Sequence, residues 1–267
     1  MVEPTPLKTT QNSLPVAALR CPNMLAVASG KGGVGKTWFA VTLCHALAKR
    51  GKRTLLFDGD LGLANVDIQL GLTPEKDLGD VIDGQITLRN AVTRYDEGKF
   101  DILAGRSGSG NLAALPAHKL SVLRNELISM AESYDYVIVD LGAGVDRAVR
   151  QMAGPAAAVY VILTDEPTSL TDAYAFIKLS RAADPEAVLR IVVNLAANGK
   201  DGRKTYETLR KVCANFLGFE PPLAGVVRRD PKVRDAIRAQ TSLLTRSPVS
   251  DAAEDVEAIA ENIIKHP

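Results

Sequence analysis

The sequence predicts an α/β fold in which a mostly parallel central sheet is covered by helices on both faces. Short apolar runs rich in branched residues alternate along the chain with longer amphipathic stretches, and a glycine-rich loop joins the first such pair. Strands that alternate with helices need crossover connections, which place the helices on the two faces of a parallel sheet. The 267 residues, of which 46% are apolar, suffice for one large domain of this kind.

Branched apolar runs mark the strands, because a strand buried on both faces needs apolar residues at successive positions. They lie at residues 24–29, 53–58, 100–104, 136–140, 157–164, 189–194 and 223–227. Stretches with apolar residues three or four positions apart mark the helices between them. They lie at residues 36–50, 117–133, 146–153, 169–184 and 202–217. Residues 105–116 are rich in Gly and Ser, which predicts a flexible loop within one domain.

The N-terminal segment differs in composition from the rest of the chain. Residues 1–22 hold prolines at positions 4, 6, 15 and 22 among polar residues. Such a segment buries little apolar surface, so we expect a mobile arm that lies on the domain or binds a partner. The domain itself is expected to span residues 23–267.

Bulk composition narrows the class of protein. Lysine and arginine total 32 against 31 aspartate and glutamate residues, so the net charge of +1 favours neither nucleic acid nor membrane as a partner. Cys21, Cys44 and Cys213 lack the spacing of a metal site and predict reduced thiols in a cytoplasmic protein. No apolar stretch approaches the ~20 residues that cross a bilayer, and the start lacks the pattern of a secretion signal.

The glycine-rich loop after the first predicted strand indicates the chemistry. It consists of Gly30, Lys31, Gly32, Gly33, Val34, Gly35, Lys36 and Thr37. Glycines let backbone N–H groups surround phosphate oxygens, and the helix that follows directs its positive end at the same anion. Lys36 is expected to bind the β- and γ-phosphates of ATP, and the Thr37 hydroxyl to ligate Mg²⁺. The loop makes the predicted fold that of a P-loop NTPase.

Two residues in and beside this loop are less usual. Lys31 is a second lysine, and a side chain at its place faces away from the γ-phosphate of its own nucleotide. It is therefore a candidate for contact with a nucleotide held by a neighbouring subunit, the alternative being a solvated loop lysine. Trp38 follows the loop and is included among the nucleotide contacts, although packing of the helix is favoured over stacking on a base.

Acidic residues follow two of the predicted strands. Asp58 and Asp60 end the run at 53–58, and Asp140 ends the run at 136–140. Ligands of open parallel sheets bind at the carboxyl ends of the strands, so these carboxylates are expected to face the phosphates. We assign Asp58 and Asp140 to Mg²⁺, held through its water shell, and Asp60 to the attacking water. A polar turn at the end of the strand is the alternative for Asp58 and Asp60.

The adenine end of the site is predicted from residues near the last strands. Asn194 ends the run at 189–194, and its amide offers the donor and acceptor that an adenine edge needs. A strand-end turn is an equal alternative. Arg228 and Asp230 are placed beside it as further nucleotide contacts. Their neighbours form a basic cluster that would suit DNA phosphates, but a solvated face is favoured and nucleic acid is not expected as a partner.

The loop with its extra lysine resembles the deviant Walker A loop of the MinD/ParA ATPase family, and Lys31 matches the intermonomer lysine of that family. Residues 58–67 resemble the MinD branch. Residues 140–144, which lack the usual proline, resemble the flagellar-number regulators called FlhG or FleN. So do residues 166–174 and 229–236. The resemblance covers about residues 24–264.

This resemblance implies a slow, Mg²⁺-dependent ATPase that is a monomer without ATP and a face-to-face dimer with it. Lys31 would then touch the nucleotide of the partner subunit, and Lys31, Lys36 and Asp60 would be the catalytic residues. The implied role is control of the number or placement of flagella, through a flagellar GTPase or transcription activator. Alternatives are a ParA-like partition ATPase that acts on DNA or another cargo, and a division-site MinD.

Two segments bear on partners. The regulators carry an arm motif that stimulates the GTPase, and here only Ala17, Leu19 and Arg20 fit it, so stimulation is in doubt.

The last segment, residues 251–265, has an apolar helical stripe and an acidic opposite face. Anionic lipid repels such a face, so we expect the stripe to pack on the sheet with Ser250 as cap, and membrane binding to be weak or absent. The location is then the cytoplasm, with recruitment to a cell pole by a partner.

Overall fold

The computed structural model describes residues 20–60, 65–105 and 115–266. The described residues form one eight-stranded sheet in the order β3-β4-β2-β5-β1-β6-β7-β8. The strands are β1 (Cys21–Ser29), β2 (Thr54–Gly59), β3 (Val92–Tyr95), β4 (Phe100–Leu103), β5 (Tyr136–Ala143), β6 (Ala156–Leu163), β7 (Leu189–Ala196) and β8 (Leu223–Arg228). All neighbouring pairs are parallel except β3 and β4. The predicted mostly parallel sheet is therefore confirmed.

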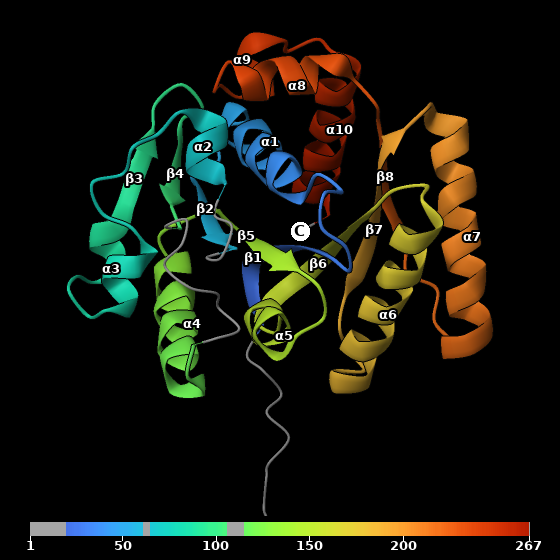
Figure 1. Ribbon diagram of the computed structural model, residues 1–267, viewed down its shortest axis with the longest axis horizontal. Helices are drawn as coiled ribbons and strands as arrows, with labels where there is room; N and C mark the ends of the chain where they lie inside the picture. Colours follow the sequence, from blue (N-terminus) through green and yellow to red (C-terminus); the bar gives the residue numbers. More distant parts are fainter. Residues whose placement is uncertain (1–19, 61–64, 106–114, 267) are drawn as a thin grey trace, which may run out of the picture.

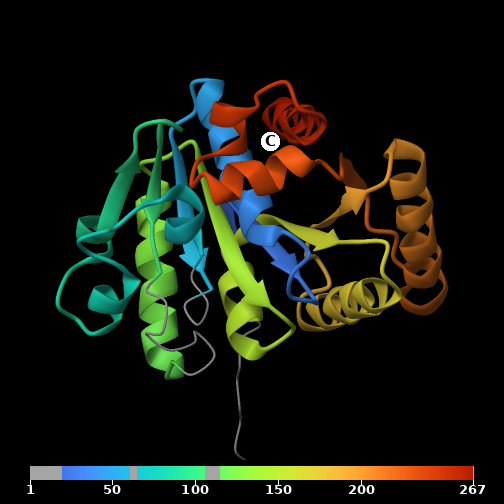
Figure 2. The same ribbon diagram turned by 45° about the horizontal axis from the view of Figure 1, so that its top comes forward.

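Helices cover both faces of the sheet (Figure 1). One face carries α4 (Ala117–Ala131), α5 (Arg147–Ala153), α6 (Pro167–Ala183) and α7 (Gly199–Leu217), with the short α3 (Leu78–Ile82) and η1 (Leu88–Ala91) at its edge. The other face carries α1 (Lys36–Lys49), α2 (Val66–Leu70), α8 (Pro231–Arg238), α9 (Leu243–Arg246) and α10 (Asp251–Lys265). Figure 2 shows α8 and α10 lying across the same face as α1.

The alternation of side chains along the strands divides the core in two. In β1, Met24 and Ala26 pack towards α4 and α6, whereas Leu25 and Val27 pack towards α1 and α10. Successive side chains of a strand point to opposite faces, and both sets here are apolar because both faces are covered by helices. This explains why the strands could be recognised as nearly continuous apolar runs.

Some boundaries differ from those predicted. Strand β1 begins at Cys21, within the predicted arm, because the Cys21 N–H donates to the Pro155 carbonyl (2.7 Å) and extends the pairing with β6. Strand β3 and the helices α2, α3, α8 and α9 were not predicted, since they are short and partly polar. Residues 1–19 of the predicted arm and 106–114 of the predicted loop lie outside the described residues.

The last helix packs as predicted. Its apolar stripe is buried against α1 and β8 and comprises Ala252, Val256, Ile259, Ala260 and Ile263. Ser250 occupies the cap position, but its side chain makes no hydrogen bond to the described first turn of the helix. Among the helices that the structure describes, none has the length and apolar character needed to cross a bilayer. Weak or absent membrane binding stays a prediction.

A buried histidine joins α1 to α9. The Nδ1 atom of His45 lies 2.7 Å from the Ser242 hydroxyl oxygen, and the side chain is 5% exposed. Burial, aided by the charge of Lys49, lowers the pKa of His45 to about 4. A histidine whose pKa is lower in the folded state binds protons more readily when unfolded. Its contribution to stability is therefore complete above pH 6.5 and is lost as the pH falls towards 4.

We expect His45→Gln to change how stability depends on pH. Relative to the wild type, the free energy of unfolding of the variant should rise by about 3 kcal/mol between pH 6.5 and 4, because only the wild type must protonate this side chain. Urea unfolding at several pH values measures the difference. Comparison with the wild type cancels the other titrating groups, and a constant difference across this range would refute the assignment.

Candidate nucleotide-binding site

The glycine-rich loop connects the carboxyl end of β1 to the first turn of α1. Gly35 stands at the cap of α1 with φ of 87°, in the left-handed region that favours glycine. Gly30 faces α6 so closely that a Cβ atom would lie 2.2 Å from the Asp172 carbonyl oxygen. These two positions therefore require glycine, for conformation in one case and for close packing in the other. The loop lies at the N-terminus of a helix, where an anion is stabilised.

Neighbouring strands hold this loop in place. The Asn194 amide on β7 donates to the Val34 carbonyl (2.8 Å), and the Ser29 hydroxyl donates to the Lys31 carbonyl (2.6 Å). The Gly144 N–H, from the turn after β5, donates to the Ser29 carbonyl (2.9 Å). The amide nitrogen of Asn194 is thus used to fix the loop, and contact of this residue with adenine stays a prediction.

The register of the strands brings two of the three predicted carboxylates together, because Asp58 on β2 pairs with Asp140 on β5. Asp58 is buried and accepts hydrogen bonds from the N–H groups of Asp60 (3.2 Å), Asn65 (3.3 Å) and Val66 (3.3 Å). Burial and the nearby charge of Asp140 raise the pKa of Asp58 to about 8. Asp58 therefore links the end of β2 to the start of α2.

The Asp140 carboxylate is buried in a place where a bound cation would stabilise it. It is fully buried, and neither of its oxygens accepts a hydrogen bond from a described residue. Burial raises its pKa to about 6, against the opposing effects of the Lys36 ammonium and the Thr37 hydroxyl. Buried carboxylates without partners are costly unless a cation compensates them. The side chains of Thr37, Asp58 and Asp140 therefore fit the predicted Mg²⁺.

Asp60 directly follows β2 and lies close to Gly142 near the end of β5. A Cβ atom on Gly142 would come within 3.6 Å of the Asp60 carboxylate. At this distance the two residues are in van der Waals contact, so Asp60 lies against the small residues of β5, and its positioning of water stays a prediction. The four residues that follow, 61–64, belong to the segment that resembles MinD and lie outside the described residues.

The two lysines of the loop point in different directions. Lys36 is 7% exposed and lies near Asp140 beneath the loop. The Lys31 ammonium instead contacts the start of α6, where it donates to the Glu166 carboxylate (2.5 Å) and the Thr168 hydroxyl (2.9 Å). We assigned no role to Glu166 or Thr168 from the sequence, since only the fold brings residues this distant in the chain together.

The remaining predicted contacts, Trp38, Arg228 and Asp230, have structural roles in this fold. Trp38, in the first turn of α1, is buried in the core, which agrees with the favoured packing role, and its indole N–H has no hydrogen-bond partner among the described residues. Arg228 pairs with Asp255 (2.8 Å) and Asp251 (2.7 Å) of α10. Asp230 caps α8 by accepting from the Lys232 N–H (2.9 Å). Nucleotide contact by these three residues stays a prediction.

The same stretch of chain matches a known family of domains. The family model of the CobQ/CobB/MinD/ParA nucleotide binding domain matches residues 25–243, which include the loop and the strands behind it. The chain belongs to this MinD/ParA family. Membership makes it a nucleotide-binding protein of an ATPase family and confirms the resemblance inferred from the loop.

Individual relatives narrow the comparison. The chain is 37% identical to the antiactivator FleN of Pseudomonas aeruginosa, over 91% of this chain and 87% of that protein. It is 30% identical to the flagellum site-determining protein YlxH of Helicobacter pylori, over 88% of this chain and 80% of that protein. The structure of MinD from Pyrococcus horikoshii, complexed with Mg-ADP, covers 91% of this chain and 96% of its own with a TM-score of 0.74 at 24% identity. This structural match shows the shared fold, and the predicted kinship with flagellar regulators is confirmed.

Proposed function

We propose that this protein is an Mg²⁺-dependent ATPase that works as a dimerising switch and controls the number or placement of flagella. The observation that carries the proposal is the difference in burial and neighbours between the two lysines of one phosphate loop. Lys36 is buried under the loop, where its own nucleotide would bind, whereas Lys31 lies at the surface. Relatives named FleN and YlxH support the flagellar part of the proposal.

In this proposal the chain holds ATP through the loop amides and Lys36. Thr37 ligates Mg²⁺, and Asp58 and Asp140 bind its water shell. Bound Mg²⁺ would neutralise charge on the β- and γ-phosphates. Asp60 orients a water molecule for attack on the γ-phosphate, beside the small residues of the turn after β5. The Mg-ADP in the structure of Pyrococcus horikoshii MinD supports a nucleotide and Mg²⁺ as the bound molecules.

Lys31 is available for contact across a dimer interface. Its side chain is 35% exposed and that of its partner Glu166 is 60% exposed. An ion pair between exposed groups contributes about 0–1 kcal/mol, so the phosphate of a second nucleotide can displace the Glu166 carboxylate at little cost. The partners we propose are therefore a second copy of the chain and, through the dimer, a flagellar GTPase or transcription activator in the cytoplasm or at a cell pole.

Lys31→Ala is expected to abolish the ATP-dependent dimer while nucleotide binding remains. The reason is that the variant loses a charge-assisted contact to the partner's phosphates but keeps Lys36 and the loop amides. Light scattering with ATP and Mg²⁺ should give the mass of a monomer. Isothermal titration should give an affinity for Mg-ADP within about twofold of the wild type, since a shift of that size is well under 1 kcal/mol.

Lys49→Ala is the matched control, because Lys49 also pairs with a glutamate, Glu257, but lies on α1 away from the loop. This variant should dimerise normally. Unchanged dimerisation of Lys31→Ala would contradict the switch. Cells that carry Lys31→Ala should also show an altered number of flagella, and a normal number despite loss of the dimer would contradict only the flagellar role.

A further inference from the structure

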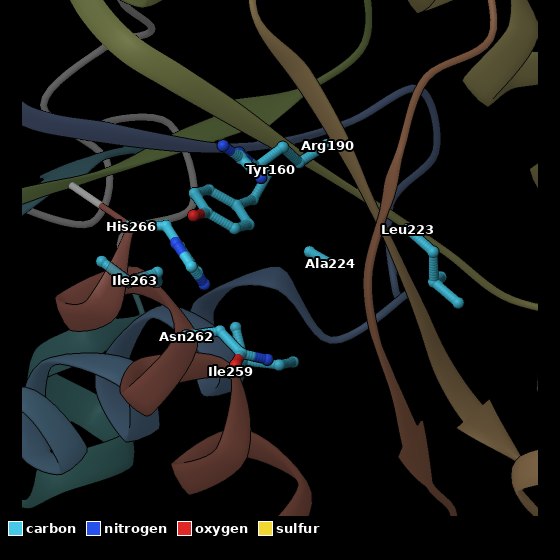
Figure 3. Close-up of a pocket in the computed structure, with 8 residues that line it drawn as sticks. All are labelled: Tyr160, Arg190, Leu223, Ala224, Ile259, Asn262, Ile263 and His266. Atoms are coloured by element: carbon cyan, nitrogen blue, oxygen red, sulfur yellow. The ribbon is translucent and has the colours of Figure 1, made fainter.

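A cavity separates the end of α10 from the sheet. Its volume is about 480 Å³, within the range of sites for small molecules. Figure 3 shows Tyr160 and Arg190 on the side of the sheet, and Asn262 and His266 on the side of the helix. Arg190 lies near the start of β7, whereas the phosphate loop follows the end of β1, so the cavity is remote from the nucleotide site.

The spacing between helix and sheet creates this cavity. At Gly225 of β8 the helix comes so close that a Cβ atom would lie 2.6 Å from the Ile259 side chain. Tyr160 and Arg190 are direct neighbours in the pairing of β6 with β7 and belong to the face that α10 covers. Their long side chains hold the end of the helix away from the sheet, and the pairing of β8 with β7 is irregular at the same level.

The polar groups that line the cavity are hydrogen-bond donors or can become donors. Arg190 is half-buried, and no described carboxylate pairs with it. No acidic residue lines the cavity within the described ranges. The acids of α10 are paired elsewhere, Glu257 with Lys49, Glu261 with Lys265 and Asp255 with Arg228. A half-buried guanidinium without a counterion is unfavourable, which makes it a candidate for ligand binding.

We propose that this cavity binds a small organic anion. The oxyanion group would accept hydrogen bonds from the Arg190 guanidinium, with the Tyr160 hydroxyl and Asn262 amide beside it. The apolar body would lie against Ile259 and Ile263, which line the same cavity. Carboxylates and phosphate esters share this chemistry. The site does not depend on the proposed ATPase switch.

Phenylacetate and phenyl phosphate are suitable probes, since each joins one oxyanion group to one apolar ring. Each is titrated into the full chain with Mg-ADP present in excess to fill the phosphate loop, and binding is followed by calorimetry. We expect saturable binding of at least one probe with a Kd of about 1 mM or lower. The probe that binds more tightly identifies the class of anion.

Arg190→Gln should weaken this binding about tenfold or more, the usual effect of losing a charged hydrogen bond. Arg246→Gln is the matched control, because Arg246 is exposed on α9 and does not line the cavity, and it should leave the Kd unchanged. Asn262→Phe, from an exposed position on α10, should also weaken binding by filling the cavity, and it replaces Arg190→Gln if that variant does not fold. Absence of saturable binding, or equal affinity in the wild type and the cavity variants, would overturn the proposal.

Discussion

Asp60→Ala is expected to reduce ATP hydrolysis by at least about 100-fold, because positioning and proton transfer by a side chain contribute about 10²–10⁴ to a rate. Affinity for ATP should change little, since Lys36 and the loop amides are retained. The dimer should then persist with ATP and Mg²⁺, because the step that ends it is removed. Release of phosphate and light scattering measure the two effects.

Asp96→Ala is the matched control for Asp60→Ala. Asp96 is an exposed carboxylate in the turn after β3, and its removal changes the charge of the protein equally. Its hydrolysis and dimerisation should equal those of the wild type. If Asp60→Ala binds ATP and yet hydrolyses it at the normal rate, or stays a monomer, the role assigned to Asp60 is wrong.

Asp140→Asn is expected to stabilise the protein at high pH in the absence of nucleotide and Mg²⁺. Its folded pKa of about 6 exceeds the unfolded value of 3.8, so the wild type loses stability as the pH rises between these values. The variant does not lose this stability, because asparagine does not ionise. Its free energy of unfolding, relative to the wild type, should rise by about 3 kcal/mol from pH 4 to pH 8. Urea unfolding at the two pH values measures it.

Asp135→Asn is the control, because this carboxylate lies just before β5 and has the opposite shift. The backbone N–H and side chain of Arg53 lower the pKa of Asp135, so its replacement should give no gain at pH 8. In the presence of ATP, Mg²⁺ should stabilise the wild type more than Asp140→Asn. The cation site would be contradicted if Asp140→Asn were no more stable than the wild type at pH 8. It would also be contradicted if Mg²⁺ with ATP stabilised the variant as much as the wild type.

The prediction for Asp140 rests on a pair of buried carboxylates. Asp58 and Asp140 are neighbours in the sheet and both are buried, and each has a raised pKa. Such a pair destabilises the fold when no cation is bound, and a divalent cation would relieve the repulsion. The free energy of binding Mg²⁺ with nucleotide is therefore expected to include relief of strain already present in the single chain.

The sequence by itself determined the elements whose signal is local. A complete phosphate loop between an apolar run and an amphipathic stretch specified the strand, turn and helix, because glycine conformation and helix termini depend on adjacent residues. The apolar runs specified most strands, because burial on both faces leaves no polar positions. Strand β3 was not predicted because it lies at the edge of the sheet, where its residues are partly exposed and form no apolar run.

Tertiary structure decided which side chains meet. It placed Asp58 opposite Asp140, brought Lys31 to Glu166, and paired Arg228 with acidic residues of α10. It also created the cavity beside Arg190, a residue that the sequence did not single out. These contacts join residues far apart in the chain, and their existence depends on strand order and register. Local patterns of apolar and polar residues do not encode either of these.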